Sequence, residues 1–116
     1  MAALNTAFNG TDLKYLLEIQ ATGFDMETDD FEVTLKKGQK TLVIKKEDMP
    51  VESYYDTDPA TNISTEKHNY YVCFDSSYFG SGPITAVVTA YVPDVDFDGG
   101  IRKLVDKFEL VNVLAV

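Results

Sequence analysis

The sequence predicts an all-β fold, a single antiparallel β-sandwich of about seven strands. Apolar residues alternate with polar ones in several short runs, and period two is typical of strands with one buried face. Gly, Pro, Asp and Asn separate these runs, as expected for turns. No segment shows a convincing helical period. The alternating apolar sets are Leu13, Tyr15, Leu17 and Ile19; Phe31, Val33 and Leu35; Tyr70, Val72 and Phe74; and Ile84, Ala86, Val88, Ala90 and Val92.

Length and composition fit one domain. The chain has 116 residues and a mass of 12.9 kDa. Its 45% of hydrophobic residues argue against a disordered chain. A domain of this size buries roughly 65% of its unfolded surface, enough for one thin core. We expect residues 1–11 to form a flexible arm and residues 12–116 to form the β-sandwich. The predicted core contains Leu17, Ile19, Val33, Leu35, Phe74, Ala86 and Val88.

The first half of the chain predicts three strands. The first spans residues 13–21 and ends before Gly23 and an acidic turn at 25–30. The next two, 31–37 and 41–46, flank Gly38-Gln39 and are predicted to form a hairpin. The stretch 47–67 contains two prolines and many small polar residues, and predicts a long loop with a short edge strand near Tyr54.

The second half predicts three more strands. Residues 68–75 and 84–92 are rich in aromatic and β-branched residues, and Gly80, Gly82 and Pro83 form the turn between them. After Pro93 and the Gly99-Gly100 turn, the spacing of several apolar residues fits a helix, but the Val-rich end favours a final strand from about Val105.

Charge restricts the partners. Nineteen acidic residues against ten basic ones give a net charge of −9, which argues against nucleic acid as a ligand because phosphate binding needs a basic surface. Five lysines between positions 36 and 46 are followed at once by Glu47 and Asp48, so we interpret them as a solvated hairpin.

The start of the chain, Met1-Ala2-Ala3-Leu4, has neither the charged nor the apolar part of a signal peptide. No apolar run approaches the length that spans a bilayer, so no membrane partner is predicted. We expect synthesis and folding in a cytoplasm.

Single residues with reactive side chains do not predict an enzyme. Cys73 is the only cysteine, and its place in a strand favours a small buried hydrophobe over a nucleophile. His68 is the only histidine, so we expect neither a multi-histidine metal site nor a histidine-paired nucleophile within one chain. The acidic groups at 25–30 and 56–58 lie in polar turns rather than in a cleft. We therefore predict no catalytic residue, no cofactor-binding residue and no metal ligand.

One loop resembles the start of a calcium site. Asp94, Asp96 and Asp98 occupy positions 1, 3 and 5, and Gly99 occupies position 6. Position 12 is Val105, where such loops carry a bidentate Glu, and the preceding segment is a strand rather than a helix. We interpret the loop as an acidic turn without stable calcium.

Two features suggest a partner surface. The chain has seven tyrosines, and the sequence does not decide between core and interface for them; alternation only places Tyr70 and Tyr71 on opposite faces. The end of the chain, 110–116, is uncharged and apolar, so we expect either a second sheet or another subunit to cover it. The sequence thus predicts a homo-oligomer or a complex with other proteins.

A family resemblance extends this interpretation. Four segments carry it: the charged hairpin 31–38, the strand 70–75 that ends in Asp, the Gly-Pro followed by a long Val/Ala/Thr strand at 82–94, and the closing run 102–108. This order is similar to small Ig-like domains of virion proteins of tailed phages and prophages of gut Bacteroidales. The nearest type is the N-terminal domain of phage upper baseplate proteins. The resemblance covers roughly residues 12–113.

The resemblance implies an Ig-like β-sandwich and a structural role in a virion. Such a protein would act as an adaptor, a decoration or a fibre-base subunit, and would bind itself and other virion proteins of the capsid, baseplate or fibre. It would be made in the cytoplasm of a bacterial host. The alternative is an Ig-like ligand-binding module, a carbohydrate-binding or calcium-dependent adhesin. Neither role requires a cofactor.

Overall fold

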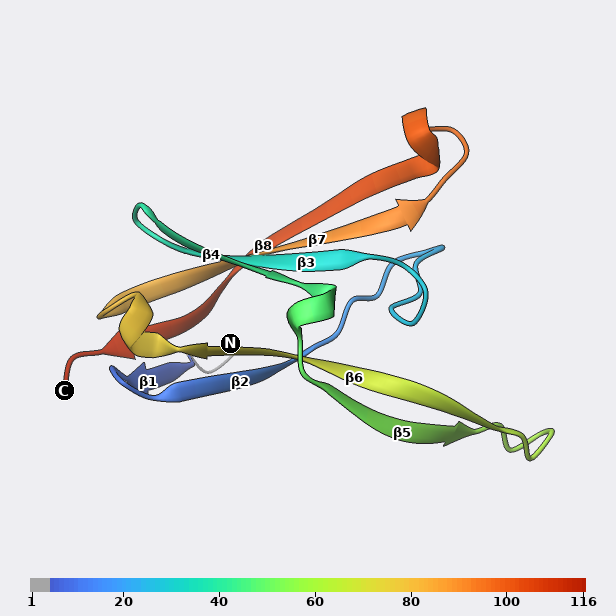
Figure 1. The fold of residues 1–116 in the computed structure, drawn as a ribbon, viewed down its shortest axis with the longest axis horizontal. Coiled ribbons are helices and arrows are strands. Elements are labelled where there is room, and N and C mark those ends of the chain that lie inside the picture. Colours follow the sequence, from blue (N-terminus) through green and yellow to red (C-terminus); the bar gives the residue numbers. More distant parts are fainter. Residues whose placement is uncertain (1–4) are drawn as a thin grey trace.

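A computed structural model describes residues 5–116 as two packed β-sheets (Figure 1). The larger sheet has the strand order β1-β8-β7-β3-β4, and the smaller has the order β2-β6-β5. The strands are β1 (Thr6–Phe8), β2 (Asp12–Leu17), β3 (Phe31–Lys37), β4 (Lys40–Lys45), β5 (Val51–Thr57), β6 (Ser64–Asp75), β7 (Gly82–Pro93) and β8 (Ile101–Leu114). Three single 3₁₀ turns, η1 (Lys46–Asp48), η2 (Ser76–Tyr78) and η3 (Asp98–Gly100), follow β4, β6 and β7.

All pairings are antiparallel except one. β1 lies parallel to the last residues of β8, with Thr6 opposite Asn112. β3 and β4 are joined by the predicted two-residue turn, in which Gly38 has a positive φ of 59°. The long β7–β8 ladder contains one bulge, because Ile84 pairs with Val111 and the next residue, Thr85, pairs with Glu109.

The core lies between the two sheets and follows the period-two pattern. On β7 every second residue, from Ile84 to Val92, is buried, and the residues between them are partly exposed. Phe31 is fully buried, and its ring meets Phe24 and Tyr70 edge to face, with centroid separations of 6.2 and 5.2 Å. Six of the seven predicted core residues are buried; Ile19 is only half-buried but packs against the same cluster.

The two sheets diverge at one end of the molecule. The tip of the β7–β8 hairpin and the tip of the β5–β6 hairpin point apart (Figure 1), and the molecule measures 52 × 37 × 30 Å. The connection between β2 and β3, residues 18–30, lies between these two hairpins. Phe24 and Met26 from this connection pack against the core.

The strand boundaries differ from the predicted ones in instructive places. The first predicted strand, 13–21, ends early, at Leu17. The segment predicted as a loop with a short edge strand contains the seven-residue β5, and β6 begins four residues earlier than expected. The final strand starts at Ile101, not near Val105.

The segment predicted as an N-terminal arm contains a strand. Thr6–Phe8 form β1 in the larger sheet, and Ala7 packs against the core. Residues 1–4 of that arm lie outside the described residues. With β1, the described chain has eight strands, against about seven expected.

Candidate functional site

One side of the sandwich is open. β2 is the outermost strand of the smaller sheet, and β8 is covered at the margin of the larger sheet only by the short β1, which pairs with Asn112, Val113 and Leu114. Between these two strand edges lies a groove of about 620 Å³. We call this feature the β2–β8 groove.

The groove is mainly apolar. Val88 and Ala90 of β7 line it together with Ile19, which follows β2, and with Leu104 of β8. Three of its large apolar lining residues are exposed: Leu16, 47% exposed, Val105, 56% exposed, and Phe108, 42% exposed. A smaller cavity of about 110 Å³ adjoins it, also lined by Leu16 and Phe108, and extends it toward the core.

The groove follows from unequal sheet widths. Phe108 pairs with Ala86, Asp106 with Val88 and Leu104 with Ala90, and Ala86, Val88 and Ala90 face the core. The β8 partners therefore point to the same inner side of the larger sheet. In the described part of the chain the smaller sheet has no strand beyond β2 to cover them. An apolar inner face thus stays accessible to solvent.

The charged residues that line the groove are all acidic. They are Glu18, next to the end of β2, and Asp106 of β8, and both are exposed. No lysine, arginine or histidine lines the groove or the adjoining cavity in the described chain. The groove therefore combines an apolar surface with negative charge.

A second polar cluster lies outside the groove, where the β2–β3 connection meets β6. His68 Nδ1 donates to Glu27 Oε1 over 2.6 Å, and His68 Nε2 lies 3.2 Å from Glu66 Oε1. The hydrogen bond to Glu27, and then the charges of Glu27 and Glu66, raise the pKa of His68 against an opposing effect of desolvation. Desolvation raises the pKa of Glu27, but the bonds from His68 outweigh it and lower that pKa overall.

Lys46 of η1 holds the same connection from the other side. Its Nζ donates to the Asp29 carbonyl over 2.9 Å and lies 5.3 Å from the Phe31 ring centroid and 5.5 Å from that of Tyr70. The ammonium thus bridges loop carbonyls and the aromatic part of the core. The roles of Glu27, Lys46 and His68 were not predicted, because no local pattern links residues so far apart in the chain.

The acidic loop after β7 is held together by the chain itself. Asp94 Oδ2 accepts from Arg102 Nε over 3.1 Å, and Asp94 Oδ1 accepts from the Asp96 backbone N–H over 3.0 Å. Both carboxylate oxygens of Asp94, the residue at position 1 of the calcium-like loop, therefore already accept hydrogen bonds. Among residues 5–116 no group of three acidic, histidine or cysteine side chains is placed to hold a metal ion.

Cys73 is exposed, so the interpretation as a buried hydrophobe is wrong. Its neighbours Val72 and Phe74 face the core, and alternation therefore turns the thiol to the outer face of the smaller sheet. Strand membership was identified correctly, but the face was not.

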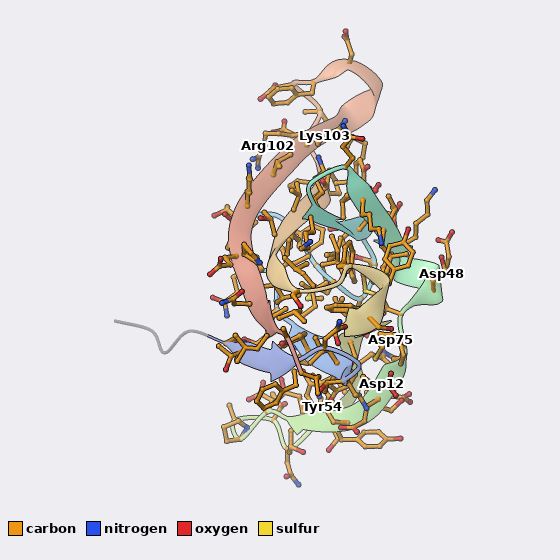
Figure 2. The ribbon with its side chains drawn as sticks, turned by 90° about the vertical axis from the view of Figure 1, so that its left-hand side faces the viewer. Asp12, Asp48, Tyr54, Asp75, Arg102 and Lys103 are labelled. Atoms are coloured by element: carbon orange, nitrogen blue, oxygen red, sulfur yellow. The ribbon has the colours of Figure 1, made fainter. Side chains whose placement is uncertain are left out.

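The tyrosines divide between core and surface. Tyr70 is buried, whereas Tyr71 lies on the other face beneath Lys14, whose Nζ is 4.4 Å from the ring centroid. Tyr54 and Tyr55 are exposed on β5, a strand that is exposed along its whole length. In Figure 2, Tyr54 lies at the opposite end of the view from Arg102 and Lys103 near the β7–β8 tip.

The apolar end of the chain is covered within the chain up to Val113. Val111 and Val113 are buried in the core, and β1 pairs with the final residues of β8. Leu114 is partly exposed and Val116 almost fully. The first of the two expected covers, the chain's own sheets, accounts for the buried part of this segment.

The described chain contains no helix of the length and apolarity needed to cross a bilayer. No family model matches the sequence, and comparisons with curated proteins and with solved structures likewise found no match.

Proposed function

We propose that this chain is an Ig-like structural protein of a phage virion, which acts by binding other proteins and not as an enzyme. The observation that carries the proposal is the β2–β8 groove, an exposed apolar surface between two unpaired strand edges. Exposed apolar patches and open edges are typical of protein interaction sites.

The strand order supports the Ig-like part. In Ig sandwiches strands B, E and D lie in one sheet, and C, F and G in the other. If β2 is strand B, then β6 and β5 take the places of E and D. In the same scheme β3, β7 and β8 are C, F and G, and β4 extends this sheet beside β3, as the C′ strand does in variable-type domains.

The virion part rests on the sequence resemblance to phage Ig-like domains. In that role the protein would be an adaptor, decoration or fibre-base subunit in contact with itself or with capsid, baseplate or fibre proteins. A net charge of −9 is compatible with a protein partner and unfavourable for a nucleic-acid partner.

The test is to purify phage particles from the strain that encodes the chain and to identify their proteins by mass spectrometry. We expect the chain at a fixed ratio to a major virion protein through successive density gradients. A chain that stays in the unassembled fraction while particles form normally would contradict the proposal.

A second candidate is an Ig-like carbohydrate-binding module. Tyr54 and Tyr55, 42% and 69% exposed on the projecting β5, favour it because exposed aromatic rings stack on sugars. A glycan ligand would raise the melting temperature of the chain, and Tyr55→Ala would remove that increase. No shift with any glycan in a broad panel would exclude this candidate.

A further inference from the structure

We infer that the β2–β8 groove binds an extended segment of another protein, which adds a strand beside β2 or β8 and carries alternating apolar residues with at least one Lys or Arg. This inference rests on the proposed function and names the site and the partner chemistry. Strand addition of this kind joins main-chain hydrogen bonds to side-chain pockets.

Both strand edges that border the groove are largely unpaired. Among residues 5–116 β2 pairs only with β6, so its other edge has no partner strand there. In the larger sheet β8 has a partner on its outer edge only at Asn112–Leu114, and the edge before it, 101–111, has none in the described chain. Unpaired backbone groups along such edges are a template for a further strand.

β1 shows that the β8 edge accepts a further strand. β1 already occupies the end of the β8 edge, where the Asn112 N–H donates to the Asn5 carbonyl over 2.8 Å. Among residues 5–116 the unpaired part of the edge continues directly from this pairing. At about 3.3 Å per residue, a six-residue segment would extend about 20 Å along it, the length of β2.

A segment added here would cover exposed apolar surface. Leu16 and Phe108 are about half exposed and line both the groove and the adjoining cavity. The apolar side chains of every second residue of an added strand would enter this space, and the others would point to solvent. Phe108, which points to the inner side of β8 opposite Ala86, supplies the apolar part of the binding free energy when it is buried.

The charge of the groove selects its occupant. Glu18 and Asp106 are the charged residues that line the groove, and neither forms an ion pair among the described residues. A basic residue in the incoming strand would neutralise them. A second copy of this chain, with its own −9 charge, would instead bring the same carboxylates together.

The experiment uses the full chain and two capped nine-residue peptides. One alternates Val with Thr and Lys, and its counterpart has Glu in place of Lys. Amide chemical shifts are recorded during titration to about 1 mM peptide, where binding of about −4 kcal/mol is half complete. We expect the lysine peptide to shift amides of β2 and β8, and the Glu peptide to bind at least tenfold more weakly.

Variants distinguish binding in the groove from nonspecific binding of the peptide. Glu18→Lys with Asp106→Lys should reverse the preference between the two peptides, and Phe108→Ala should weaken binding of the lysine peptide. Val43→Ala is the matched control, because Val43 is 47% exposed on β4, at the opposite edge of the same sheet. We expect it to bind like the parent.

Three results would overturn the inference. They are no binding of the lysine peptide, shifts that map to β4 or β5, and concentration-dependent self-association through the same amides without peptide. The proposed function can fail independently of this inference. If the chain binds the peptide but is absent from particles, the binding site is supported and the virion role is refuted. If the chain is found in particles but does not bind the peptide, only the proposed binding site is refuted.

Discussion

The Glu27 carboxylate binds the His68 residue twice. It accepts from the His68 ring over 2.6 Å and from the His68 backbone N–H over 2.9 Å. The two residues lie 41 positions apart, so this contact fixes the β2–β3 connection to β6. Since the connection also carries Phe24 and Met26 into the core, the contact joins a polar surface cluster to core packing.

The stability that this contact provides should depend on pH. The raised pKa of His68 means that its contribution is complete below 6.5 and is lost as pH rises through the folded-state pKa. The lowered pKa of Glu27 means that its contribution is complete above 4.5 and is lost as pH falls through the folded-state pKa. His68→Gln should therefore lower the melting temperature most between pH 4.5 and 6.5.

The measurement is the melting temperature of parent and His68→Gln chains across pH 4 to 9. Glu109→Gln, at an exposed position of β8, serves as the control and should show no such window. A difference between parent and His68→Gln that stays constant across pH would show that the contact contributes no charge-dependent stability.

Phe31→Ala should strongly destabilise the fold. The ring is fully buried between two aromatic neighbours, and a Phe-to-Ala change at such a site costs about 3–5 kcal/mol. Urea unfolding measures the loss. Val43→Ala, on the exposed face of β4, should change stability by about 0.5 kcal/mol or less. Equal effects of the two changes would contradict the assignment of the core.

Lys46→Met should loosen the β2–β3 connection. The change keeps most of the aliphatic chain but removes a charged donor to the Asp29 carbonyl and the cation above Phe31 and Tyr70. We expect a loss of about 1–2 kcal/mol. Lys45→Met, an exposed neighbour, is the control. If both variants unfold at the same urea concentration, Lys46 is not an anchor.

The β5–β6 hairpin should open locally before the rest of the fold. All seven residues of β5 are exposed, and a two-stranded ribbon without a packed face is marginal in water. Hydrogen exchange should be at least about tenfold faster for the amides of β5 than for those of β6 between Tyr70 and Phe74. Protection of β5 equal to that of β6 in the isolated chain would indicate a covering contact.

Calcium should leave the melting temperature unchanged at about 1 mM, because Arg102 and the Asp96 N–H already occupy both Asp94 oxygens. Arg102→Met frees one of these oxygens and is the informative variant. Calorimetry on both chains provides the check. Sub-millimolar binding by the parent that Asp96→Ala abolishes would refute this expectation.

The sequence by itself determined which residues form strands where one face is buried. On β7 the period-two spacing of Ile84, Ala86 and Val88 gave both the strand and its inner face, because a pleated chain turns successive side chains to opposite sides. The same rule underestimated the length of β5, because this strand has no buried face and its sequence shows no alternating pattern.

Tertiary structure alone decided which faces are covered and which distant residues meet. Phe108 lies on the inner side of β8, yet remains exposed because the opposite sheet ends at β2. Glu27 and His68 meet because β2 pairs with β6, which places the β2–β3 connection beside β6. Periodicity specifies the face of a strand but not its partner. A local turn predicted the β3–β4 pairing, whereas the pairing of strands far apart in the sequence depends on how the whole sheets pack.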